Sequence, residues 1–206
     1  MAVQAASGTM SRSQTQRRKR IVQTAAALAV RGGVDAMQMR SVAERAGVAL
    51  GTLYRYFPSK MDLVVAVVTE ELDLLEGGIV RRPPTADTAA GRAVDVLLRA
   101  TLGLMREPEL ADALVRSLIT AEVRIELDTR ICDLVWRVAT DDLTNLPVGE
   151  EVSDAPVDRD STGYVLIGSL ISVWIFELVE VLKGHRDVDE VERRLHITAE
   201  RLLASF

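Results

Sequence analysis

Residues 40–60 read RSVAERAGVALGTLYRYFPSK and contain two short helical patterns that meet at Gly47. The first pattern has an apolar edge that includes Val42 and Ala46, and glycine at the junction permits a tight turn that a side chain would crowd. The second pattern, residues 50–56, surrounds a short apolar seam with polar and aromatic side chains that face outward. This layout is typical of a helix-turn-helix, whose second helix enters the major groove of DNA. The motif alone leaves one alternative open, an ordinary helical hairpin with a polar face.

Three groups of residues in this region keep a specific order and spacing. They read Arg40-x-Val42-Ala43-x-x-Ala46-Gly47-Val48, then Gly51-Thr52-Leu53-Tyr54-x-Tyr56-Phe57, then Ser59-Lys60-x-x-Leu63. With them, the stretch from Arg17 to Leu63 resembles the TetR family of bacterial transcriptional regulators. Two positions depart from the family pattern, because Ala49 stands where many members have serine and Met39 lies near a start often marked by threonine. Both departures weaken the side-chain N-caps expected at the starts of the two helices, and they leave the motif itself intact.

The resemblance implies an all-α fold, in which three N-terminal helices bind DNA and a larger C-terminal helical domain binds a ligand and dimerises. TetR-like regulators are dimers, and an enclosed inducer alters the separation of their two recognition helices. The N-terminal region is also similar to actinobacterial regulators of cholesterol and steroid catabolism. This second similarity is carried by residues 17–21, 32–33, 39–40 and 51–60.

The partner implied for the N-terminal domain is double-stranded operator DNA. The resemblance places Arg40, Tyr54, Tyr56, Lys60 and Thr52 in contact with it. Among the residue types present, Thr52 and an arginine at position 55 suit base edges, whereas the tyrosines and the lysine suit phosphates. The complete set of expected DNA-binding residues is Arg17, Arg18, Lys19, Arg40, Gly51, Thr52, Tyr54, Arg55, Tyr56 and Lys60.

Charge is divided unevenly along the chain. The net charge is −5, but residues 1–62 hold ten Lys/Arg against three Asp/Glu, a net +7, and residues 63–206 hold fifteen against twenty-seven, a net −12. A basic module on an acidic body suits a protein that places only one end on a polyanion. The run Arg17-Arg18-Lys19-Arg20 begins the first helical pattern, and we expect it to contact phosphates or the minor groove. A solvated helix end is the alternative.

The expected organisation is a disordered tail (residues 1–12), a helix-turn-helix DNA-binding domain (13–62) and a ligand-binding and dimerisation domain (63–206). A helix capped by Ser59 should join the two domains and end near Glu76, because Asp62 stands at the capping-box position and Gly77-Gly78 marks a break. Other helices are predicted at 13–31, stopped by a glycine pair, and within 94–105, 110–118, 123–143, 164–182 and 188–206, with a loop at 144–159.

The stretch from Tyr164 to Phe176 is the most apolar in the chain. We expect no membrane span, because 13 residues are fewer than the about 20 that a bilayer needs. A buried strand would suit its β-branched residues, but the apolar pattern continues to Leu182 and favours a helix. A helix that is apolar on nearly all sides must be buried all round. We therefore expect it to pack with the last helix in a homodimer interface, with a purely internal core as the alternative.

Apolar residues between positions 94 and 182 exceed what two-sided helix packing normally needs, which favours a cavity for a hydrophobic ligand. The expected inducer is largely apolar, derived from a steroid or a fatty acid, including its coenzyme A thioester. Arginines 99, 106 and 137 are near enough in sequence to meet an acidic tail, with a merely solvated side chain as the alternative for each. For the apolar side chains the alternative is a solid core. The expected ligand-binding residues are Leu102, Met105, Leu118, Trp136, Val173 and Trp174.

The sequence offers no support for catalysis, since it lacks a phosphate-binding Gly-rich loop, a Gly-x-Ser-x-Gly elbow and His-rich metal spacing. We expect no cofactor and no metal. The single cysteine, Cys132, excludes an internal disulfide and a cysteine-based zinc site and suits the cytoplasm. Three hypotheses remain: a ligand-responsive dimeric repressor, a constitutive DNA-binding regulator whose C-terminal domain only dimerises, and a carrier or enzyme with an incidental helix-turn-helix.

Overall fold

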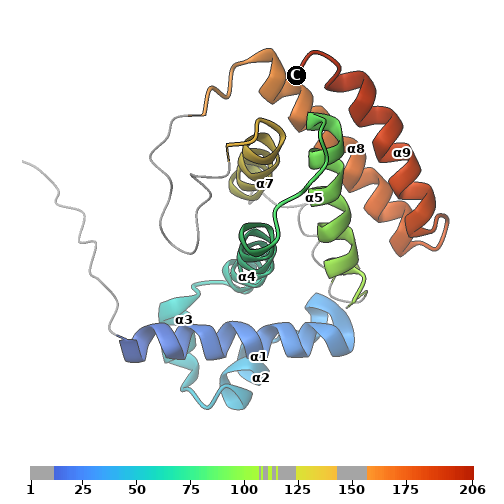
Figure 1. Cartoon of the computed structure of the whole chain (residues 1–206). Helices are drawn as coiled ribbons and strands as arrows, with labels where there is room; N and C mark the ends of the chain where they lie inside the picture. The colour runs from blue at the N-terminus through green and yellow to red at the C-terminus, as the bar shows by residue number, and fades with distance from the viewer. Residues whose placement is uncertain (1–11, 107, 109–110, 113–114, 116–123, 143–156) are drawn as a thin grey trace, which may run out of the picture. The chain divides into compact units, whose positions relative to one another are not determined.

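The computed structural model describes residues 12–106, 108, 111–112, 115, 124–142 and 157–206, and over these residues the chain is helical without a strand (Figure 1). The chain forms two compact units, Met1–Val67 and Val68–Phe206, whose boundary falls inside α4. The all-α fold class is confirmed. The described helices are α1 (Arg12–Ala36), α2 (Met39–Arg45), α3 (Leu50–Tyr56), α4 (Lys60–Arg81), α5 (Ala89–Leu104), α7 (Arg124–Ala139), α8 (Thr162–Leu182) and α9 (Val188–Leu202).

Three of the expected segments fall mainly on other residues. The tail before Arg12, most of the predicted helix at 110–118 and nearly all of the predicted loop at 144–159 lie outside the described part of the chain.

The first unit is built around the predicted apolar seam. Leu53 of α3 is fully buried, as is Phe57 directly after the helix, and both belong to a core that includes Ile21 of α1. Gly47 in the turn between α2 and α3 has a φ of +65°, a conformation that residues with a Cβ rarely adopt. The N-cap residues of α2 and α3, Gln38 and Ala49, form no side-chain cap hydrogen bond, yet both helices begin close to the expected positions. The helix-turn-helix is therefore formed at the predicted residues.

The first helix ends in a kink at the predicted glycine pair. Gly32 and Gly33 both have non-helical backbone angles, and Gly33 has a φ of +66°. The continuous range Arg12–Ala36 thus contains a regular helix followed by a redirected turn.

The start of α4 matches its prediction, whereas its end does not. The N–H of Ser59 donates to Asp62 Oδ2 at 2.8 Å, and the N–H of Asp62 donates back to Ser59 Oγ at 3.2 Å, which completes the capping box. The predicted end near Glu76 is wrong, because the helix continues to Arg81. A glycine costs a helix only about 1 kcal/mol relative to alanine. Burial of Ile79 in the core of the second unit offsets that cost.

The core of the second unit lies among α5, α7, α8 and α9. The apolar segment is a helix, so the strand alternative is wrong. Among the described residues, α8 is also the one helix long and apolar enough to cross a membrane, so the expectation that this segment is too short for a span is wrong too. Length and composition alone do not separate a membrane span from a core helix of a soluble protein, and α8 packs on α7 and α9.

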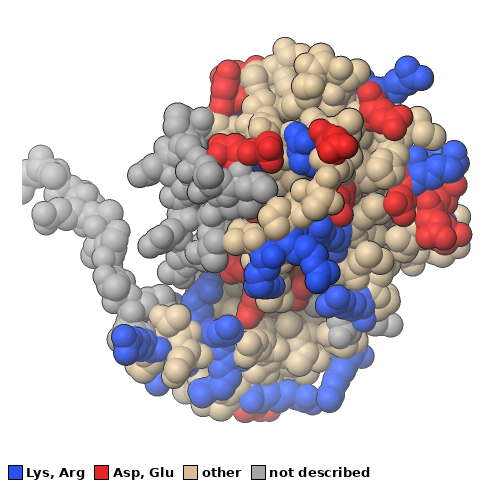
Figure 2. All heavy atoms as spheres, viewed as in Figure 1, with Lys and Arg blue, Asp and Glu red and all other residues tan. Residues whose placement is uncertain are grey.

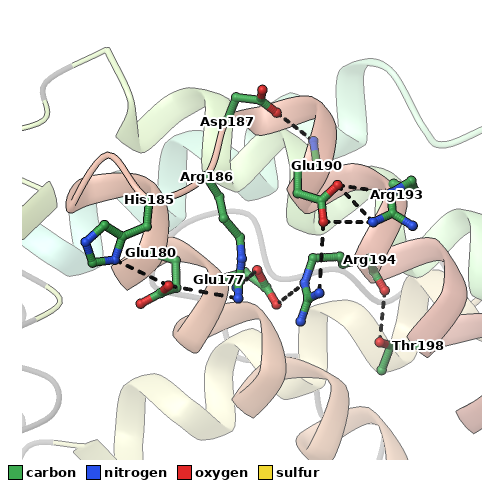
Figure 3. A network of polar contacts seen from close by, with 9 residues as sticks. All are labelled: Glu177, Glu180, His185, Arg186, Asp187, Glu190, Arg193, Arg194 and Thr198. Atoms are coloured by element: carbon green, nitrogen blue, oxygen red, sulfur yellow. Dashed lines mark hydrogen bonds and ion pairs between the residues drawn. The ribbon is translucent and has the colours of Figure 1, made fainter.

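A buried carboxylate links α8 to α9 (Figure 3). Glu177 of α8 is only 1% exposed, although it lies in the most apolar helix. Arg194 Nε of α9 donates to Glu177 Oε1 at 2.8 Å, and Arg186, from the turn between the two helices, donates to Oε2. Because a buried charge is tolerated only with a partner, these contacts fix how α8 and α9 meet.

A second buried carboxylate links α4 to α7. Glu76 is 2% exposed, and Arg130 of α7 donates to both of its oxygens, from Nε at 2.8 Å and from Nη2 at 2.5 Å. The same Nη2 also reaches Asp73 Oδ1 at 2.5 Å. Burial raises the pKa of the Glu76 carboxyl above its ordinary value, and Arg130 opposes that rise.

Replacing Arg130 with methionine should destabilise the protein in a pH-dependent way. Loss of one partner of a buried ion pair costs about 3–5 kcal/mol, and without Arg130 the pKa of Glu76 rises further. A carboxyl whose pKa is higher in the folded state contributes stability at low pH that is lost as the pH rises through that value. Urea unfolding should therefore show a larger deficit relative to wild type at pH 8 than at pH 5.

The control is the double variant Glu76→Gln/Arg130→Met, which has no carboxyl at position 76. Its deficit should be nearly the same at both pH values. An Arg130→Met deficit that does not change with pH would contradict the role assigned to this pair.

Candidate nucleic-acid interface

The outward face of α3 presents three of the predicted DNA-binding residues. Gly51, Tyr54 and Arg55 are exposed and lie three and four positions apart, so they share one face of the helix. Thr52 and Tyr56 are half-buried beside this face. A Cβ added at Gly51 would meet no atom within 4 Å, so packing inside the chain does not require glycine there. Bare backbone at this point instead permits another molecule to approach closely.

Two more predicted residues lie at helix starts of the same unit. Arg40 is exposed in the first turn of α2. Lys60, the first residue of α4, is half-buried, and its Nζ lies 3.8 Å from Asp35 Oδ1. Figure 2 shows basic side chains over much of the visible face of this unit. The predicted positions therefore combine an exposed helix face with cations on two neighbouring helices.

The basic run in α1 divides into residues whose charged groups have a partner inside the chain and residues whose charged groups have none among the described residues. The Arg18 guanidinium lies 5.4 Å from the centroid of the Phe57 ring, a cation–π distance. Arg20 Nε donates at 2.9 Å to the carbonyl of Ala46, the C-cap residue of α2. Within the described residues, Arg17 and Lys19 form no ion pair or side-chain hydrogen bond. The sequence did not reveal this division, because it depends on contacts between helices.

Two of the predicted ligand-binding positions lie in or against the core of the second unit. Trp174 of α8 is buried, and its Nε1 donates to Thr101 Oγ1 of α5 at 2.9 Å. Trp136 is half-buried, and its ring centroid lies 5.9 Å from that of Tyr164 and 5.6 Å from that of Phe206. Each tryptophan thus has a partner in another part of the chain, Thr101 for Trp174 and Tyr164 and Phe206 for Trp136.

The other four ligand-binding positions differ in exposure. Met105 and Val173 are half-buried against the core, where each leaves part of its surface uncovered. Leu102 is 54% exposed. Leu118 lies outside the described residues.

The three arginines expected to meet an acidic tail are also in different environments. Arg99 Nη2 lies 2.5 Å from Asp95 Oδ2 on the same helix. Arg137 is only 5% exposed, and its Nη1 lies 3.8 Å from Asp142 Oδ2. Arg106, after the end of α5, is exposed. In the described part of the chain, no three His, Cys, Asp or Glu side chains lie together in a group that could hold a metal ion.

Comparisons with known proteins agree with the helix-turn-helix geometry. Residues 21–67 match the family described as "Bacterial regulatory proteins, tetR family". The chain is 33% identical to the HTH-type transcriptional repressor KstR of Rhodococcus jostii, over 94% of this chain and 85% of that protein. It is 31% identical to KstR of Mycolicibacterium smegmatis, over 95% of this chain and 91% of that protein.

A solved structure extends the likeness to both units. The crystal structure of a TetR transcriptional regulator from Rhodococcus sp. RHA1 is similar with a TM-score of 0.77 at 29% identity, over 94% of this chain and 99% of that chain. These findings confirm the resemblance carried by the N-terminal motifs and continue it beyond them. The curated relatives are named as transcriptional repressors, which agrees with the lack of a catalytic motif in the sequence.

Neutralising Arg17 and Lys19, the two basic-run residues without an ion pair or side-chain hydrogen bond among the described residues, should reduce the salt dependence of DNA binding. Removal of one phosphate contact lowers the slope of log K against log salt by about 0.9, so Arg17→Gln/Lys19→Gln should lower it by about 1.8 for each subunit bound. Fluorescence anisotropy with an operator duplex at several salt concentrations measures the slope.

Lys183→Gln, which removes an exposed cation of the second unit, is the matched control and should leave the slope unchanged. If the slope were also unchanged in Arg17→Gln/Lys19→Gln, the prediction would be wrong, and Arg17 and Lys19 would be solvated residues without a phosphate contact.

Proposed function

Because this chain belongs to the TetR family of bacterial transcriptional regulators, we propose that it is a repressor that binds a palindromic operator as a homodimer and is released by an apolar ligand. The observation that carries the proposal is the exposed face of α3, with Gly51, Tyr54 and Arg55 set in a unit of net charge +7. Thr52 and Arg55 read base edges, while the tyrosines and Lys60 position the protein on phosphates. Such a regulator acts in the cytoplasm, where the DNA lies.

The surface of α8 supports the homodimer. Only 33% of its most apolar 18-residue window is buried within one chain. Val165 and Phe176 are 58% and 56% exposed, and the exposed Ser169 and Ser172 continue the same stripe between them. Large apolar residues with small ones between them permit close helix contact with a second copy. A two-fold dimer carries two recognition helices, so its operator should contain an inverted repeat.

The apolar inducer is proposed from the second unit and from the relatives. Met105 and Val173 leave apolar surface beside the core, and methionine adapts well to irregular ligands. The similarity to actinobacterial regulators of steroid catabolism favours a steroid- or fatty-acyl-derived molecule, including a coenzyme A thioester. Arg106 is the exposed cation best able to meet its acidic end.

Charge placed on the exposed stripe of α8 should separate the dimer. In Val165→Glu/Phe176→Glu, two carboxylates would have to be buried against the second copy, which costs far more than leaving them in water. Sedimentation should show folded monomers, and operator affinity should fall because each half-site is bound alone.

The control Thr85→Glu adds charge at an exposed site between α4 and α5 and should remain dimeric. Ile171 and Leu195 are unsuitable positions for this test, because both are buried inside one chain and charge there would unfold it. Dimers that persist in the stripe variant would place the interface elsewhere.

Micromolar steroid or long-chain acyl thioester should release the protein from operator DNA. The variant Met105→Trp/Val173→Trp should still bind DNA but resist release, since larger side chains reduce the space for a ligand. Leu74→Trp, at an exposed site of α4, is the control and should respond like wild type.

Release by a cationic drug, with no effect from any lipid-like compound, would contradict the proposed inducer. Operator binding that no small molecule alters would favour the constitutive regulator instead.

A further inference from the structure

A surface hollow of about 320 Å³ lies on the first unit, between α1 and the C-terminal end of α2. It is separate from the exposed face of α3, none of whose residues lines it. Its lining includes Arg20, Gln23, Thr24, Leu28 and Arg31 from one face of α1, and Arg45 from the last turn of α2.

The charge of this hollow is of one sign. Arg20, Arg31 and Arg45 line it, and no carboxylate of the described residues does. Within the described residues, none of the three pairs with an acidic side chain. Arg20 is held by its Nε hydrogen bond to Ala46, which leaves its other N–H groups available. Three guanidinium groups without an acidic partner around one hollow favour an anion, and guanidinium is the side-chain group best matched to phosphate.

The hollow adjoins the turn that leads into α3. Arg45 lies two residues before Gly47. Arg20 binds the carbonyl of Ala46, which is the C-cap residue of α2 and directly precedes Gly47. A phosphate here would therefore belong to DNA beside the bases that α3 reads. The volume exceeds what one phosphate needs, and the lining also includes Leu28 and Ala27, which suit the apolar side of a deoxyribose.

We propose that this hollow binds the sugar-phosphate backbone of the DNA that flanks each half-site, as a contact additional to those of the recognition helix. The inference rests on the proposed operator binding. The contact is independent of sequence, because phosphate and sugar carry no base identity. It lengthens the stretch of duplex that contributes to affinity without lengthening the sequence that is recognised.

The test compares wild type with Arg31→Gln/Arg45→Gln on two duplexes, the selected operator alone and the same operator with random flanks on both sides. Arg20 is kept, because it caps α2. Wild type should show a steeper salt dependence on the flanked duplex. The variant should lose that increment, about 0.9 in slope for each phosphate that is no longer neutralised, and should match wild type on the short duplex.

Two controls accompany the comparison. Thermal unfolding should show that the variant is as stable as wild type, and Arg193→Gln/Arg201→Gln, with two exposed arginines of α9 replaced, should retain the flank-dependent increment. Inorganic phosphate, at constant ionic strength and at concentrations far above those of the duplex, should compete with DNA for the hollow. It should therefore reduce the flank-dependent increment of wild type and leave binding by the variant unchanged.

Equal salt slopes for wild type on both duplexes would overturn this site and leave operator binding intact. An equal loss on the short and flanked duplexes would also overturn it, because the arginines would then act within the recognised sequence or through the fold. Competition by phosphate without any flank dependence would make the hollow a site for a free anion and overturn the DNA contact. Failure of wild type to select any duplex would overturn the proposed function itself.

Discussion

The ion pair between Glu76 and Arg130 is the constraint that holds the C-terminal part of α4 to α7 within the second unit. Glu76 lies on the part of α4 inside the second unit, and its carboxylate is buried with Arg130 of α7 on both oxygens. Breaking such a pair costs about 3–5 kcal/mol, whereas coupling between allosteric sites is typically about 1–3 kcal/mol. Any displacement of α7 would therefore carry this part of α4 with it rather than separate the two. Because α4 continues into the first unit, the ligand that we propose would act on that unit most directly through this helix.

Glu177 has a comparable role between α8 and α9. Buried ion pairs add little net stability compared with apolar packing, but they restrict the arrangements that are tolerated. Arg186 and Arg194 approach the carboxylate from the turn and from α9, so sliding of α9 along α8 would withdraw Arg194 from it (Figure 3). The apolar face of α8 left exposed is thereby held in a defined position. A rigid surface suits the proposed dimer, because the two recognition helices of the DNA-bound form must match the spacing of the two half-sites.

Local signals explain which features the sequence could predict. The ends of α3, the turn at Gly47 and the capping box at Ser59 depend on residues within a few positions, and all were predicted. The end of α4 was missed, because burial of Ile79 in a distant core overrides the helix-breaking tendency of two glycines. The exposed face of α3 was predicted from its motif. The Arg-lined hollow was not, since it requires the packing of α1 on α2.

Contacts between helices also determine which cations of the basic first unit are available to DNA. Its net charge suggests an evenly attractive surface, yet the cations differ in what they already contact. Arg20 caps α2, Arg18 lies over Phe57, and Lys60 lies near Asp35. A cation with such a contact can still meet a phosphate, but it must keep or exchange that contact when it does. The salt dependence of binding follows the number of phosphates neutralised rather than the net charge. The positions of the cations without internal partners therefore determine the electrostatic footprint on the duplex.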